Sequence, residues 1–76
     1  MRFQVKAQFA ELEVLIADYT VKSKKLTFNK LNVKYAGSRV AQIVKQCYKA
    51  PAMLGKGCQY TFKLDGVEYE VFYVGR

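Results

Sequence analysis

The chain has 76 residues and a net charge of +7, from 13 Lys and Arg against 6 Asp and Glu. This length allows one domain, and a hydrophobic fraction of 51% excludes a disordered tail because it is enough to form a core. The longest aliphatic run, residues 14–17, is too short to cross a bilayer, and polar residues interrupt the N-terminal segment. We therefore expect no membrane span and no signal peptide. Two Cys are too few for a disulfide-built secreted scaffold, so we expect a cytoplasmic protein.

The N-terminal segment alternates between apolar and polar residues, which predicts a half-buried strand over residues 2–9. Residues 10–19 fit two patterns. Leu12, Val14 and Ile16 alternate as in a strand, which would need a bulge near residues 10–11. Phe9, Leu12, Ile16 and Tyr19 also fit a helical stripe, and we favour the strand only slightly.

The next segment predicts two short strands after a basic loop at residues 22–25. Residues 26–28 and 31–35 both alternate, and their parity changes at Asn29 and Lys30, where we expect a kink or turn. Lys30 and Lys34 then share the polar face of the second strand, where they could contact phosphates or discourage edge-to-edge aggregation.

A helix is predicted over about residues 38–49, with Ser38 as its N-cap. Its apolar stripe recurs at helical spacing and consists of Val40, Ile43, Val44, Cys47 and Tyr48. Pro51 disfavours helical geometry at the residue before it, so we expect the helix to end near Lys49.

The C-terminal part predicts a β-hairpin with strands 58–64 and 67–74. Asp65-Gly66 between two alternating runs favours a type I′ turn, and a two-residue loop fixes the register. Leu64 then opposes Val67, and Lys63 opposes Glu68. Together these elements predict an α+β fold: a small single domain with a mostly antiparallel sheet of four to five strands and one helix packed on one face.

The charge is concentrated in the middle of the chain. Residues 19–64 hold ten basic residues and no acid, whereas both flanking segments are slightly acidic. Such a single-sign block attracts nucleic acid or an acidic protein surface, although lysines also keep small proteins soluble. The candidate contact residues are Lys22, Lys24, Lys25, Lys30, Lys34, Arg39, Lys45, Lys49 and Lys56.

The sequence offers little for catalysis, and we expect no enzyme, metal or cofactor. There is no His, which removes the commonest general base and metal ligand. Cys47 and Cys58 match no metal spacing; reduced thiols are the simpler interpretation and a disulfide is the alternative. The segment Gly55-Lys56-Gly57 lacks the first Gly and the Ser or Thr of a phosphate-binding loop, so it is better explained as a connector.

Two aromatic residues are candidate anchors for a partner. Phe72 has the outward parity of Glu68 and Glu70, and Tyr35 lies within the lysine-rich segment. Two functions follow as hypotheses: a non-enzymatic basic protein that binds nucleic acid or a nucleic-acid-processing complex, or an inhibitor or adaptor that blocks a protein partner. The second resembles phage and mobile-element anti-defence proteins, such as anti-CRISPR proteins, in size alone. Open sheet edges would also allow a homodimer by strand pairing.

Overall fold

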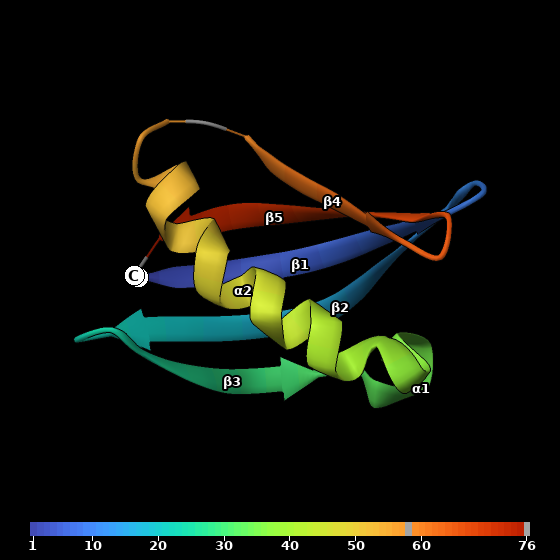
Figure 1. Cartoon of the computed structure of the whole chain (residues 1–76), viewed down its shortest axis with the longest axis horizontal. Coiled ribbons are helices and arrows are strands. Elements are labelled where there is room, and N and C mark those ends of the chain that lie inside the picture. Colours follow the sequence, from blue (N-terminus) through green and yellow to red (C-terminus); the bar gives the residue numbers. More distant parts are fainter. Residues whose placement is uncertain (58, 76) are drawn as a thin grey trace.

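The computed structural model describes residues 1–57 and 59–75. They form one antiparallel sheet in the strand order β3-β2-β1-β5-β4, crossed on one face by α2 (Figure 1). The strands are β1 (Arg2–Phe9), β2 (Leu12–Lys22), β3 (Lys25–Leu31), β4 (Tyr60–Leu64) and β5 (Val67–Gly75). The helical segments α1 (Val33–Ala36), η1 (Gly37–Arg39, a 3₁₀ turn) and α2 (Val40–Leu54) follow one another between β3 and β4. The predicted α+β class is confirmed.

Residues 12–19 belong to β2, so the strand interpretation is confirmed for them and the helical stripe is wrong. Ala10 and Glu11 form a two-residue turn, with Ala10 at a φ of 53°, and Phe9 pairs with Leu12 across it. The change of parity comes from a bulge farther along, where Val5 pairs with Ala17 but Lys6 pairs with Leu15. The bulged residue is Ile16, which is fully buried. The prediction of a bulge is therefore confirmed, but the bulge lies at Ile16 and not near residues 10–11.

The expected strand over residues 31–35 is wrong. β3 ends at Leu31, and the chain turns into α1 because Asn32 caps it: its side-chain oxygen accepts from the Tyr35 amide at 3.4 Å. The side-chain nitrogen of Asn32, Nδ2, donates to the Leu15 carbonyl at 3.3 Å. Such local bonds from Asn compete with a strand ladder. The predicted irregularity at Asn29-Lys30 is confirmed, since the register skips Asn29 between Tyr19–Phe28 and Asp18–Lys30.

The helix differs from the prediction at both ends. Residues 37–39 form η1, so Ser38 is not the N-cap, and α2 continues to Leu54 with Pro51 inside it. A proline at this place has no N–H for the carbonyl of residue 47, four residues earlier. The Tyr19 hydroxyl donates to that Cys47 carbonyl at 3.3 Å. The sheet therefore supplies the donor that Pro51 lacks, and burial of Ala50 holds this last turn on the sheet.

The C-terminal hairpin is confirmed residue by residue over the described part. Leu64 pairs with Val67, and Asp65 and Gly66 have φ values of 51° and 78°, as a type I′ turn requires. β4 begins at Tyr60, and the expected first residue, Cys58, lies outside the described residues. β5 continues one residue past the expected end, to Gly75.

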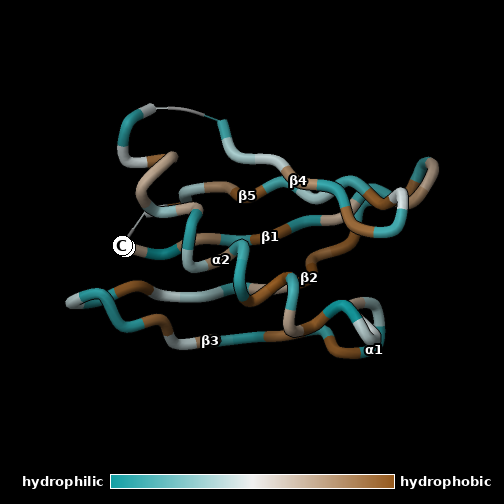
Figure 2. Tube along the Cα trace, viewed as in Figure 1, coloured by the Kyte–Doolittle hydropathy of each residue, from teal (hydrophilic) through white to brown (hydrophobic). Residues whose placement is uncertain are grey.

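The core lies between α2 and one face of the sheet. Hydropathy alternates along β1 (Figure 2), where Phe3, Val5 and Ala7 face α2 and are fully buried. Across from them α2 buries Ile43, Cys47 and Ala50. The opposite face of the sheet has no helix over it in the described chain, so its side chains are available for other contacts. No helix among the described residues is long and apolar enough to cross a membrane.

Candidate binding surface

The uncovered face of the sheet, here called the open face, carries the even-numbered side chains of β1 and their neighbours on the other strands. Arg2, Gln4, Lys6 and Gln8 alternate with the buried residues of β1 and so point away from α2. Cross-strand pairing extends this face to Asp18 and Thr20 on β2 and to Glu68, Glu70 and Phe72 on β5. The charges on it are not mixed evenly but divide into an acidic and a basic part.

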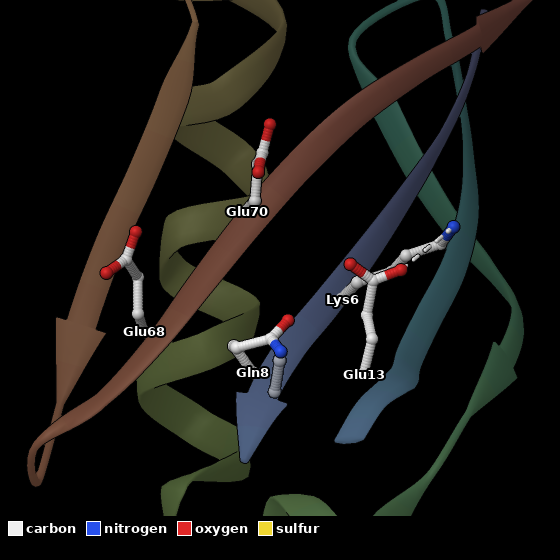
Figure 3. Close-up of a pocket in the computed structure, with 6 residues that line it drawn as sticks. Lys6, Gln8, Glu13, Glu68 and Glu70 are labelled. Carbon is white, nitrogen blue, oxygen red and sulfur yellow. Dashed lines mark ion pairs between the residues drawn. The ribbon is translucent and has the colours of Figure 1, made fainter. Parts of the chain in front are cut away.

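The acidic part surrounds a depression over β1, β2 and β5 (Figure 3). It is lined by Lys6, Gln8, Glu13, Glu68 and Glu70, with the Lys6 ammonium 3.6 Å from Glu13. The same ammonium lies 5.3 Å from the centre of the Phe72 ring, a cation–π distance. No group of His, Cys, Asp and Glu within residues 1–57 and 59–75 is arranged to hold a metal. This part of the face repels phosphates.

The basic part is the β2–β3 hairpin. Lys22 pairs with Lys25, and Lys30 pairs with Asp18, which puts all three on the open face. An open depression at the hairpin is lined by Lys22, Ser23, Lys25 and Thr27. None of these lysines forms an ion pair with a described residue. The β2–β3 hairpin therefore combines hydroxyl groups with ammonium groups that form no ion pair to a described residue. Both kinds of group donate hydrogen bonds to phosphate oxygens.

The hairpin turn is built from residues that the geometry does not favour. Ser23 and Lys24 both have positive φ, 51° and 65°, a conformation that suits Gly or Asn. For other L-residues the left-handed conformation costs about 1 kcal/mol or more per residue. The hairpin is therefore less stable than one with Asn-Gly at its turn, but its two turn residues carry a hydroxyl group (Ser23) and an ammonium group (Lys24).

Asp18 lies on the β2–β3 hairpin and could neutralise one of its lysines, but it forms an ion pair with Arg2 instead. Asp18 is 5% exposed and accepts from Arg2 Nε at 2.9 Å, Gln4 Nε2 at 3.1 Å and Asn29 Nδ2 at 3.2 Å. The hydrogen bond from Arg2 is the largest cause that lowers the pKa of Asp18 far below its usual range. Arg2 pairs with Thr20 and Gln4 pairs with Asp18, so Arg2 and Asp18 are diagonal neighbours. This register depends on the bulge at Ile16, which the sequence pattern did not locate.

The remaining basic candidates lie on other elements than the β2–β3 hairpin. Lys34 lies on α1, at the opposite end of the sheet from the β2–β3 turn (Figure 1). Arg39 is engaged within the fold: it donates to the Tyr69 hydroxyl at 3.1 Å and to the Tyr35 carbonyl at 3.2 Å, and lies 3.7 Å from Asp65. Lys45 and Lys49 are exposed on α2, and Lys56 is exposed in the turn after it.

The two aromatic candidates lie on different faces. Phe72 pairs with Gln4 on the open face and is half-buried under Lys6. Tyr35 lies on α1, is 38% exposed, and packs its ring 5.8 Å from that of Phe9. They cannot serve as one anchor.

Burial disfavours a reactive role for Cys47. Its side chain is fully buried in the core, and this burial raises the pKa of the thiol to about 12. A nucleophilic cysteine needs its thiolate, which this environment disfavours.

Comparison of the chain with protein-family models, with curated proteins and with solved structures finds no match.

Proposed function

We propose that this protein is a non-enzymatic basic protein that binds nucleic acid through the β2–β3 hairpin. The observation that carries the proposal is the clustering of Lys22, Lys24, Lys25 and Lys30 on one hairpin, with none of them in an ion pair to a described residue. Ser23 and Thr27, which carry hydroxyl groups, line a depression together with Lys22 and Lys25. Ammonium and hydroxyl groups of this kind contact phosphates without reading sequence.

The division of charge on the open face orients the partner. Glu13, Glu68 and Glu70 surround the depression at the far part of the face, so a phosphate backbone is repelled there and attracted to the hairpin. The Arg2–Asp18 pair lies between the two parts and carries little net charge. The contact thus involves a few phosphates at one end of the molecule, and its affinity depends on salt because bound cations are released from the nucleic acid.

Two matched triple variants test the proposal. Lys22, Lys25 and Lys30 are replaced by Gln in one, and the exposed Lys34, Lys56 and Lys63 in the other, so both lose the same charge. Binding to labelled DNA and RNA is measured by anisotropy over a salt series. The hairpin variant should lower the slope of log K against log salt by about 2 to 3, at about 0.7–0.9 per lost phosphate contact. Equal effects of the two variants would overturn the hairpin as the site.

An apolar patch at the other end of the molecule supports a second candidate function, binding of a protein partner as an inhibitor or adaptor. Leu12, Val33 and Tyr35 are exposed there, and α1 packs against β2. Exposed apolar residues that lie together mark protein interfaces. In this case Leu12→Ser and Tyr35→Ala would abolish the complex with that partner, whereas the hairpin variant would only slow association.

A further inference from the structure

A groove separates the β2–β3 hairpin from the second half of α2. Its lining residues are Val21, Lys24 and Leu26 from the hairpin and Tyr48, Pro51 and Ala52 from α2. Val21 pairs with Leu26, and both pack against the core, so they form an apolar floor. The groove lies on the side of the sheet that α2 covers, around the hairpin turn from Lys22 and Lys25.

Tyr48 is the exposed aromatic wall of this groove. The sequence pattern placed it in the buried stripe, but α2 turns Ile43, Cys47 and Ala50 to the sheet and leaves Tyr48 59% exposed. Pro51 and Ala52, one turn later, are too small to cover its ring. A large ring that faces a groove without being buried is available to stack on another flat group.

The charges around the groove have one sign. All six lining residues come from the acid-free segment 19–64, and Lys24 is the charged residue among them. Lys45, three residues before Tyr48 on α2, lies next to it on the helix surface. The site therefore complements a ligand with a flat apolar ring and an anionic group close to it. A nucleotide with an unpaired base has both.

We infer that the groove binds an unpaired base of a single-stranded nucleic acid, stacked on Tyr48. Lys24 contacts the adjacent phosphate, and the strand continues around the hairpin turn to Lys22 and Lys25. This inference rests on the proposed function and adds the class of nucleic acid. Stacking on an aromatic side chain requires a base released from its neighbours, so duplexes cannot use the groove and bind through the hairpin lysines alone.

A tryptophan reporter tests stacking directly, because the chain contains no Trp. In Tyr48→Trp, a single-stranded oligonucleotide should quench the indole fluorescence, and a duplex of the same sequence should leave it unchanged. Tyr48→Ala should weaken single-strand binding on the order of 10-fold, with the salt slope unchanged, because one stacked base is lost and no phosphate contact. Tyr48→Phe keeps the ring and should retain the affinity.

Tyr35→Ala is the matched control, since it removes an exposed tyrosine ring at the opposite end of the sheet and should not affect binding (Figure 1). Equal loss of single-strand and duplex affinity in Tyr48→Ala, or no quenching by single strands that do bind, overturns the inference and leaves hairpin binding intact. No binding of any nucleic acid at low salt overturns both. Quenching by an acidic peptide and not by oligonucleotides would assign the groove to a protein.

Discussion

The Tyr19 hydroxyl donates a hydrogen bond to the Cys47 carbonyl, the acceptor that Pro51 leaves without a helical partner. Removing this hydroxyl should show how much the hydrogen bond contributes to stability. In Tyr19→Phe the buried carbonyl loses the hydroxyl that lies 3.3 Å away, while the ring keeps its packing with Phe3 and Phe28. Pro51 has no N–H to replace it. A buried acceptor left without its partner costs about 1–3 kcal/mol, so the substitution should lower the free energy of unfolding by that amount.

The same loss should shrink when the helix can supply its own donor. Pro51→Ala restores an N–H four residues after Cys47, so in that background Tyr19→Phe should cost less by about 1 kcal/mol. Urea unfolding of the parent, both single variants and the double variant completes the cycle. For a domain of this size, 1 kcal/mol corresponds to a change in Tm of about 4–8 °C. Coupling below about 0.3 kcal/mol, within the error of additivity, would refute the role given to Tyr19.

Three further predictions concern the charged and strained parts of the fold. The low pKa of Asp18 means that its ionised form stabilises the native state above the unfolded pKa of about 3.9, and this contribution is lost as the pH falls below it. In denaturant unfolding, the advantage of the parent over Asp18→Asn should therefore shrink from pH 5 towards about pH 2; an advantage independent of pH would contradict the Arg2 pairing. Replacing Ser23-Lys24 by Asn-Gly should stabilise the hairpin by about 1 kcal/mol or more, because both residues have positive φ, and should weaken nucleic-acid binding; lower stability would show that the turn is not strained. Cys47 should resist alkylation in the native protein and react at the rate of unfolding, and rapid labelling of Cys47 in native buffer, located by peptide mapping, would argue against its burial.

The elements that the sequence predicted well are those with a local cause. Asp65-Gly66 specifies its turn through the φ values of two residues, and a two-residue loop then determines every pair along the hairpin. The α2 stripe was found for the same reason, since helical spacing is local. The strand expected over residues 31–35 was wrong at residues 33–35 because the cap from Asn32 is a single hydrogen bond, which an alternating pattern does not reveal.

The errors in α2 have a tertiary cause. Pro51 was read as a stop because it removes a donor from the helix, and only the fold brings the Tyr19 hydroxyl to the carbonyl concerned. The same contacts turn Ile43, Cys47 and Ala50 inward and expose Tyr48. A pattern of five apolar residues does not say which of them lies at the edge of the stripe.

The sequence predicted which basic residues could form the candidate site but not where they lie in the fold. The acid-free segment 19–64 identified the basic residues, but it spans a hairpin at one end of the sheet and α1 at the other (Figure 1). Strand parity and pairing separate Lys22, Lys25 and Lys30 from Lys34, and side-chain contacts engage Arg39 within the fold. Charge along the chain thus indicated a class of partner, and the register was needed to locate the contact.

The most direct test of the central claim is the affinity of the unmodified protein for single-stranded and duplex nucleic acid across a salt series. Contacts from the four hairpin lysines predict that Kd weakens on the order of 10²-fold between 50 and 200 mM salt, with single strands bound more tightly than duplexes. A Kd that does not change with salt, or no binding at 50 mM salt, would contradict the account.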